Sequence, residues 1–220
     1  MTNFAYDFGN GFATHQLLLY EAVQRTTGPV IEFGCGEGST VMLHELCKAT
    51  KRRLISVDNN PEWLGKYRDK YETDWHRFYL VSPEGCGGKY HDCTHWDPFL
   101  KTITSSDVQW GVVFVDQAPW EARTKTIRAM KSRADFVVLH DSNYFPENPF
   151  ELPTDHFFGR EILPLLGAHD PGYRDYSDMF AHFHEYYPKE PWPDPVKGPP
   201  PLLGSEFHAC EWDLSSIEGS

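Results

Sequence analysis

The chain has 220 residues, of which 40% are hydrophobic and 15% aromatic, and its formal net charge is −12 at pH 7. This length and composition predict a single α/β domain, residues 1–220, with a sizeable core. The acidic balance argues against nucleic acid or anionic membranes as partners, because both need clustered Lys and Arg. No apolar run reaches the length of a membrane span, and no signal peptide is evident. Five cysteines without a framework pattern fit reduced thiols, so we expect a cytoplasmic protein, whose oligomeric state the sequence leaves open.

The N-terminal segment, residues 1–28, begins irregularly and then predicts a helix. Thr14 is expected to cap this helix, which runs to about Arg25 with its leucines on the buried side. The β-favouring residues Val30–Phe33 predict the first strand. This strand opens a ligand-binding core that we place at residues 29–142.

The most informative run of the chain follows this strand and reads Glu-Phe-Gly-Cys-Gly-Glu-Gly-Ser-Thr. It contains alternating glycines and then two hydroxyl residues that open a helix: Gly34, Gly36, Gly38, Ser39 and Thr40. A turn without side chains lets a ligand press against backbone amides at the start of a helix. A dinucleotide fingerprint, Gly-x-Gly-x-x-Gly, would need its third glycine at Ser39, which counts against a nicotinamide site.

The second predicted strand, Arg53–Asp58, ends in a carboxylate about twenty residues past the glycines, where a ribose-binding acid belongs. Further along the chain, strands and helices alternate, and the strands are almost uniformly apolar. The predicted elements are a helix from Pro61 capped by Asn60, a strand Arg77–Val81, a strand Gly111–Asp116, a helix Trp120–Arg133 and a strand Asp135–Asp141. Such alternation predicts a parallel sheet covered by helices on both faces.

Residues 143–220 are expected to form a substrate-side loop and a C-terminal hairpin. A short helix is predicted at residues 157–166, and strands at Met179–Tyr186 and Leu202–Cys210. Aromatic side chains after the fifth strand are expected to shape an apolar pocket. These are Tyr144, Phe145 and Phe150.

The glycine run resembles, at every position, the motif Glu/Asp-x-Gly-x-Gly-x-Gly of the class I S-adenosylmethionine (SAM)-dependent methyltransferases. The resemblance implies a three-layer, Rossmann-like α/β fold with a mostly parallel seven-stranded sheet, order 3-2-1-4-5-7-6, and an antiparallel C-terminal strand. It implies SAM as cofactor, with Glu32 near the amino group of its methionine part and Asp58 on its ribose. The residues expected to bind SAM are Glu32, Gly34, Cys35, Gly36, Gly38, Ser39, Thr40, Asp58, Asn59 and Asp116.

The ends of the fourth and fifth strands resemble the catechol-type small-molecule O-methyltransferases, which bind a metal there. Asp116 and Asp141 match two of the ligand positions, but the amide is displaced to Asn143 and His140 has no counterpart. Asp116, Asp141 and Asn143 would suit Mg²⁺. His140 instead suggests a softer metal or a metal-free site with an imidazole base, so the metal stays open. The expected catalytic residues are Asp116, His140 and Asp141.

The sequence therefore predicts methyl transfer from SAM to a small-molecule acceptor, most readily at a hydroxyl oxygen. Two alternatives stay open. One is a SAM-binding but non-catalytic partner or regulatory subunit, and the other, less favoured, is an NAD-linked dehydrogenase.

Overall fold

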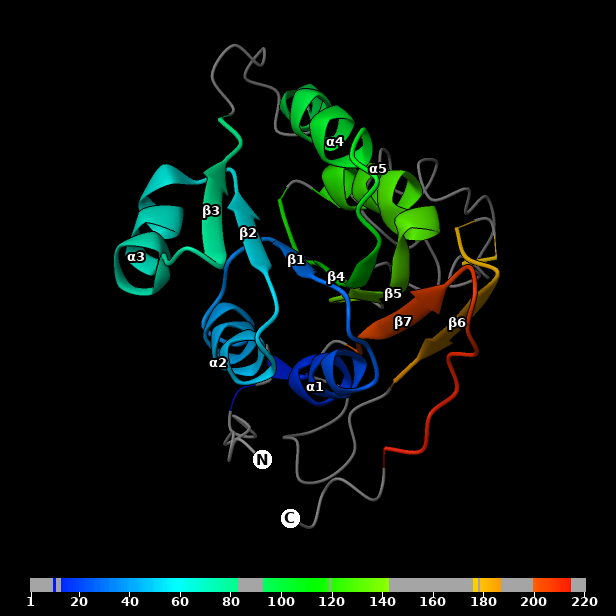
Figure 1. The fold of residues 1–220 in the computed structure, drawn as a ribbon. Coiled ribbons are helices and arrows are strands. Elements are labelled where there is room, and N and C mark those ends of the chain that lie inside the picture. Colours follow the sequence, from blue (N-terminus) through cyan, green and yellow to red (C-terminus); the bar gives the residue numbers. More distant parts are fainter. Residues whose placement is uncertain are drawn as a thin grey trace.

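The computed structural model describes residues 10, 13–82, 93–118, 120–142, 176–177, 179–186 and 200–214. The strands of this part form one sheet in the order β3-β2-β1-β4-β5-β7-β6 (Figure 1). Their bounds are β1 Val30–Phe33, β2 Leu54–Asp58, β3 His76–Leu80, β4 Trp110–Val115, β5 Ala134–Leu139, β6 His182–Glu185 and β7 Leu202–Ser205. Strands β1 to β5 pair in parallel, and β7 runs antiparallel to both β5 and β6. The predicted strand order and antiparallel ending are confirmed.

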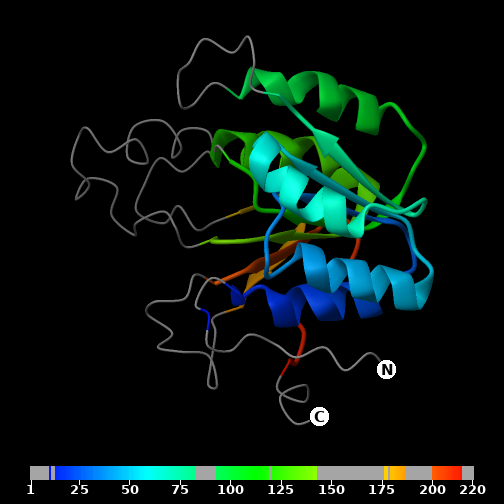
Figure 2. The ribbon, with the colours of Figure 1, turned by 90° about the vertical axis from the view of Figure 1, so that its left-hand side faces the viewer.

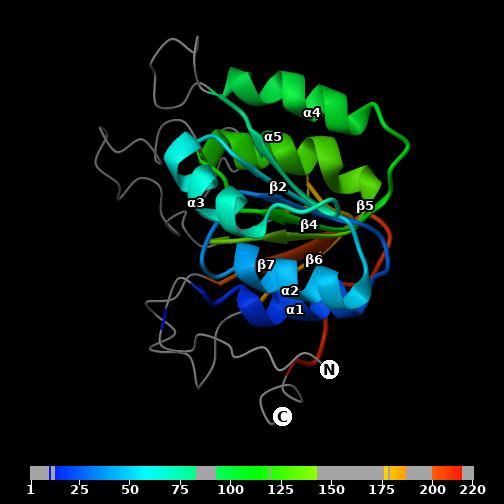
Figure 3. The same cartoon turned by 60° about the vertical axis from the view of Figure 1, so that its left-hand side comes forward.

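Helices cover both faces of the sheet and make three layers (Figures 2 and 3). Helices α1 and α2 lie on one face, and α4 and α5 lie on the other. Helix α3 packs against β2 and β3 at one end of the sheet. The helix bounds are α1 Gln16–Gln24, α2 Thr40–Thr50, α3 Pro61–Tyr71, α4 Asp97–Thr104 and α5 Trp120–Met130, with short 3₁₀ turns at Thr94–Trp96 and Lys131–Arg133.

Alternation along the strands divides the core into two apolar clusters. In β1, Ile31 and Phe33 join the cluster of Trp96 and Leu100 on the α4/α5 side. Val30 joins the other cluster, which includes Leu43 of α2. Successive side chains of a strand point to opposite faces. The same alternation decides on which face of the sheet the residues directly after each strand emerge, and these residues include the functional groups.

Some predicted element boundaries were wrong. Helix α1 begins after His15, which occupies the N-cap position without a side-chain cap, so Thr14 does not cap it. Asn60, in contrast, caps α3 as predicted by accepting from the amides of Glu62 and Trp63. Strand β7 ends at Ser205 because the Ser205 hydroxyl oxygen accepts from the amides of Phe207 and His208, which turns the chain.

Helix α4 lies in a stretch for which the sequence pattern was too weak to predict an element. It starts with Asp97 and Pro98, and it turns Leu100 into the α4/α5 core. The predicted helix at residues 157–166 and the aromatic residues Tyr144, Phe145 and Phe150 lie outside the described residues.

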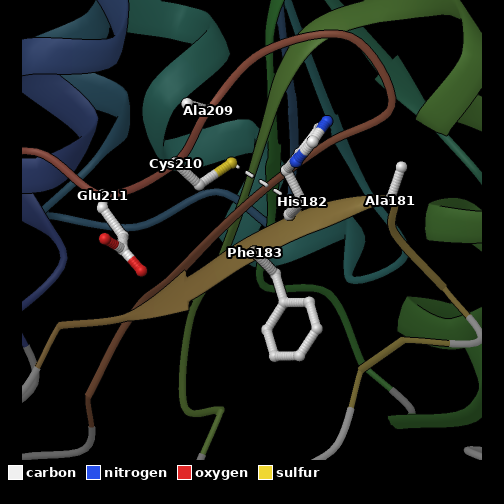
Figure 4. Close-up of a pocket in the computed structure, with 6 residues that line it drawn as sticks. All are labelled: Ala181, His182, Phe183, Ala209, Cys210 and Glu211. Carbon is white, nitrogen blue, oxygen red and sulfur yellow. Dashed lines mark hydrogen bonds between the residues drawn. The ribbon is translucent and has the colours of Figure 1, made fainter.

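The edge of the sheet is formed by β6, where alternate side chains point to opposite sides (Figure 4). Phe183 packs against the α4/α5 cluster, while His182 points away from it. The Cys210 thiol donates to the carbonyl of His182 at 3.3 Å and ties the following segment to this edge. None of the described helices is long and apolar enough to cross a membrane.

Candidate functional site

Strand alternation brings residues from β4, β5 and the start of α1 together at the carboxyl ends of the strands. Phe114 and Val138 point into the α1/α2 cluster, so Asp116 and His140, two positions further on, emerge on the same side. His15, directly before α1, lies against this site. Its ring centroid is 4.8 Å from that of Phe114 and 4.6 Å from that of His140, which it meets edge-on.

The glycine turn after β1 passes close to the end of β4. Gly34 has φ of +92°, and a Cβ there would lie 2.6 to 2.8 Å from backbone atoms of Asp116 and Gln117. Only a residue without a side chain fits such a position. The next turn is closed by Gly36, whose amide donates to the Thr40 hydroxyl oxygen at 2.9 Å. Backbone atoms therefore line the floor between β1 and β4.

Asp58, at the end of β2, holds this turn from the neighbouring strand. Its two carboxylate oxygens accept from the amides of Cys35 and Asn60, each at 2.8 Å. Burial raises the pKa of Asp58, although these backbone donors oppose the shift. Asn59 donates from its side-chain amide to the carbonyl of Ala118 at 3.0 Å, which ties the end of β2 to the loop after β4.

Glu32 lies behind the glycine turn and is fully buried. Its carboxylate accepts from the hydroxyls of Ser39 at 2.5 Å, Ser56 at 2.6 Å and Thr40 at 3.0 and 3.1 Å. Burial raises the pKa of Glu32 to about 7 even though these donors favour the charged form. Ser39 and Thr40 therefore use their hydroxyls to hold Glu32, and Ser39 makes no side-chain cap for α2.

Asp116, His140 and Asp141 form a compact cluster beside the turn. The Nδ1–H of His140 donates to both carboxylates, at 3.1 Å to Asp116 and 3.0 Å to Asp141. Asp141 adopts a left-handed backbone with φ of 57°, which is uncommon outside glycine and directs its side chain back to His140. The sequence thus correctly placed these three residues together, and the left-handed backbone of Asp141 was not predictable from it.

Arg123 of α5 is a further member of the cluster, which the sequence analysis did not predict as a site residue. Its guanidinium lies 2.8 Å from an Asp116 oxygen and 3.4 Å from an Asp141 oxygen. It also donates to the carbonyls of Asp116, Gln117 and His140. Only 9% of its side chain is exposed. Arg123 is therefore a buried residue that links the ends of β4 and β5 through ion pairs and hydrogen bonds.

The two imidazoles of the site have opposite protonation preferences. Burial disfavours the charged form of His140, but the carboxylates of Asp116 and Asp141 outweigh it and raise its pKa to about 10. Burial and the neighbouring His140 lower the pKa of His15 to about 3. Burial also acts on Asp116, but His140 and Arg123 outweigh it and hold its pKa well below the usual range. The site therefore carries one imidazolium and one neutral imidazole near neutral pH.

Three ring nitrogens of the two imidazoles lie buried at this site. Neither ring nitrogen of His15 has a hydrogen-bond partner among the described residues, nor does Nε2 of His140. All three atoms are inaccessible to solvent. Buried polar groups are normally satisfied, so these nitrogens hold unused hydrogen-bonding capacity in two rings that line the cavity described next. His15 carried no signal in the sequence, since it stands outside every motif.

A cavity of about 400 Å³ joins the glycine turn to this cluster. Its lining residues are Asn10, His15, Cys35, Gly36, Glu37, Gly38, Ser39, Trp63, Asp116, His140 and Asp141. Seven of them were predicted site residues. Of the others predicted, Glu32, Gly34, Thr40, Asp58 and Asn59 are not in the lining, and Asn143 lies outside the described residues. Burial raises the pKa of the Cys35 thiol, so it is an inert part of the wall.

A divalent metal was one option for the acidic cluster. Ligand atoms of Asp116, His140 and Asp141 lie within 4.8 Å of one another. However, the Arg123 guanidinium already pairs with both carboxylates and His140 donates to both, so two positive groups balance two negative ones. Mg²⁺ also prefers a set made of oxygen ligands. The described residues therefore do not fit Mg²⁺, and the chemistry proposed below uses no metal.

Comparison with known proteins bears on the fold. No protein-family model and no curated protein matches the sequence. Among solved structures, the chain is similar to SAH-bound Podospora anserina methyltransferase PaMTH1, with 12% identity, 86% of this chain and 75% of that chain covered, and a TM-score of 0.50. It is also similar to cofactor-bound Rv0187 from MTB, with 15% identity, coverage of 93% and 83%, and a TM-score of 0.54. Together with the strand order, these likenesses show that the chain has the Rossmann-like fold of the class I methyltransferases.

Proposed function

We propose that the protein transfers a methyl group from SAM to a hydroxyl oxygen of a small-molecule acceptor. The observation that carries the proposal is the cavity that joins the glycine turn to the two imidazoles and the acidic cluster. At the glycine turn, backbone atoms are open to a nucleoside cofactor. At the opposite end, the imidazoles and carboxylates can accept or donate a proton. In parallel α/β sheets, ligands bind at this edge, outside the carboxyl ends of the strands.

The cofactor would lie along the turn. Backbone of Cys35 and Gly36, which line the cavity, would contact its methionine part. Asp58 stands at the end of β2 beside the cavity and not in its lining, and it would accept from ribose hydroxyls that extend past Cys35, with the lone pairs that its two amide contacts leave free. Glu32 would act through the hydroxyls of Ser39 and Thr40, because it is fully buried behind them. Its negative charge favours a ligand that carries an ammonium and a sulfonium.

The charge balance of the site suits a cationic methyl donor. The four charged groups of the cluster, Asp116, Asp141, Arg123 and protonated His140, sum to zero. A sulfonium that enters beside Asp116 would lower the pKa of His140, because two cations in one low-dielectric cavity repel. Binding of SAM would therefore favour loss of the proton from His140.

Methyl transfer would restore that proton. As the acceptor oxygen forms its bond to the methyl carbon, the carbon–sulfur bond breaks and its electron pair stays on sulfur, which becomes neutral. The hydroxyl proton of the acceptor passes to the imidazole pair of His15 and His140, which prefers to hold one proton between its members. Alignment in a site that excludes water supplies the rest of the acceleration. SAM and acceptor become S-adenosylhomocysteine (SAH) and methylated acceptor, with the site back in its starting charge state.

Titration calorimetry in two buffers of different ionisation enthalpy tests this function. At about pH 9, just below the pKa of His140, SAM should release a larger fraction of a proton on binding than SAH, which lacks the sulfonium charge. The substitution His140→Gln should abolish the difference, and His182→Gln, on the edge strand, should preserve it. A screen of small-molecule extracts with methyl-labelled SAM then identifies the acceptor.

Each alternative predicts a different outcome. A non-catalytic SAM-binding subunit would bind SAM and SAH but transfer no label to any acceptor. A dehydrogenase would bind NAD tightly and give no heat with SAM. Either result would overturn the proposed methyl transfer.

A further inference from the structure

A second set of buried polar groups crosses the sheet on the α2 side, away from the cavity. Glu32, Ser56 and His76 stand on the adjacent strands β1, β2 and β3, and the register pairs Glu32 directly with Ser56. All three are fully buried. His44 of α2 covers them and keeps 7% of its surface exposed. The set therefore runs from a buried carboxylate to a residue in contact with solvent.

These groups form a continuous chain of hydrogen bonds. Ser56 Oγ lies 2.6 Å from a Glu32 oxygen and 2.9 Å from His76 Nε2, and His76 Nδ1 lies 3.0 Å from His44 Nδ1. A serine hydroxyl has one proton. If Ser56 donates it to the Glu32 carboxylate, His76 must donate from Nε2 to Ser56, and His44 must donate from Nδ1 to His76. Each of these hydrogen bonds is then donated in the direction of Glu32.

We propose that His44, His76 and Ser56 form a proton relay that exchanges the proton of Glu32 with solvent and so sets how firmly the glycine turn holds the cofactor. The step balances. A proton taken up at His44 Nε2 lets the Nδ1 proton of His44 move to His76 Nδ1. The Nε2 proton of His76 then moves to Ser56, and the Ser56 proton moves to Glu32. Both imidazoles end neutral, each hydrogen bond is reversed, and Glu32 becomes a neutral acid.

The pKa values of the hydrogen-bonded groups support proton movement from His44 toward Glu32. Burial and the neighbouring His44 lower the pKa of His76 to about 3, so a proton crosses this ring without resting on it. Burial raises the pKa of Glu32 to about 7, so its charge changes near neutral pH. Other titratable groups act on the two ends of the chain. They are Asp58 on β2, Cys35 in the turn, Cys47 on α2 and Tyr67 on α3 toward Glu32, and Glu45 and Lys48 on α2 toward His44.

The charge of Glu32 matters for the turn because three hydroxyls depend on it. As a carboxylate, Glu32 accepts from Ser39 and Thr40, and Thr40 in turn accepts from the amide of Gly36. As a neutral acid, Glu32 donates to Ser56 and loses acceptor capacity for the hydroxyls that shape the turn. Ser56 and His76 are therefore positioning residues, which act on the cofactor site through Glu32.

Infrared spectroscopy of the ligand-free protein tests the relay without any cofactor. The carbonyl band of a protonated buried carboxyl should appear as pH falls through about 7, and Glu32→Gln should remove it. Ser56→Ala should move its midpoint to higher pH, since the carboxylate loses a donor. His76→Phe should slow its appearance after a pH jump, whereas His182→Gln should change neither. A band that responds identically in the wild type, Ser56→Ala and His76→Phe would overturn the relay.

The link to the cofactor rests on the proposed function and is tested separately with SAH. If SAH lowers the pKa of Glu32 by one unit, its Kd should tighten about fivefold between pH 6 and pH 8. This pH dependence should vanish in Glu32→Gln. A wild-type Kd that does not change over this range would refute the link, and absence of SAH binding at every pH would refute the proposed function while leaving the infrared result to decide the relay.

Discussion

The sharpest single test of the cofactor site is Asp58→Asn. Asn preserves the size of the side chain but replaces one carboxylate oxygen with an amide that donates. In the folded protein, both oxygens of Asp58 accept backbone amide protons, from Cys35 and Asn60. One of these donors therefore faces another donor in the variant. The same change removes the negative charge that the ribose hydroxyls would bind.

The size of the effect follows from the hydrogen bonds that Asn cannot make in this position. A hydrogen bond to a charged group contributes about 1.5–3 kcal/mol, so removing one backbone hydrogen bond should lower the free energy of unfolding by about that amount. Removing one charged hydrogen bond to the ribose should weaken binding by a similar amount, which corresponds to about 10- to 150-fold in Kd. The two effects are measured separately, by denaturant unfolding and by titration of the folded variant with SAH.

Asp69→Asn is the matched control for this prediction. Asp69 lies on α3 with 82% of its side chain exposed, so the same chemical change should leave unfolding within about 0.5 kcal/mol and SAH binding unchanged. An Asp58→Asn protein that is folded and binds SAH within twofold of the wild type would show that Asp58 does not hold the ribose.

Three other perturbations test the turn, the imidazolium and the acidic cluster. Gly34→Ala should lower the free energy of unfolding by about 2–4 kcal/mol, from a left-handed backbone and backbone contacts under 3 Å, whereas Gly65→Ala, a helical position with open space around it, should raise it by about 0.5–1 kcal/mol in urea unfolding. The stabilising effect of protonated His140 should be complete below about pH 6.5 and lost as pH rises toward 10, so the difference in Tm between wild type and His140→Gln should shrink across this window. Addition of a metal chelator should leave the affinity for SAH unchanged. A decrease in SAH affinity that Mg²⁺ restores would contradict the metal-free site.

Much of the fold could be predicted because its determinants are local. The apolar runs of β1, β4 and β5 and the glycines after β1 encode a buried parallel sheet with a bare turn. The carboxyl ends of parallel strands share one edge, so the sequence also brought Asp116 together with His140 and Asp141. These predictions needed only the order of elements along the chain.

The parts that could not be predicted depend on which face a helix presents. His15 meets His140 only because α1 covers the side of the sheet to which β4 and β5 turn their even-numbered residues. Arg123 reaches the cluster because α5 begins next to the ends of β4 and β5. Neither residue stands in a motif, and no local pattern records the packing that places them.

The alternation of side chains along the strands puts the polar residues of the site on one face of the sheet and apolar core residues on the other. Glu32, Ser56, Asp58, Asp116 and His140 lie on the α1/α2 side, whereas the strand residues in the α4/α5 cluster are apolar. An apolar truncation on the α4/α5 side should therefore lower stability without moving the pKa of either imidazole, because the charged groups keep their partners. A truncation under α1 should do both, since it admits water beside His15 and His140, which relieves the burial that lowers the pKa of His15 and screens the carboxylates that raise the pKa of His140. The buried ionisable groups of the site thus lie on one side of the sheet, where a cationic ligand has a large effect on their protonation.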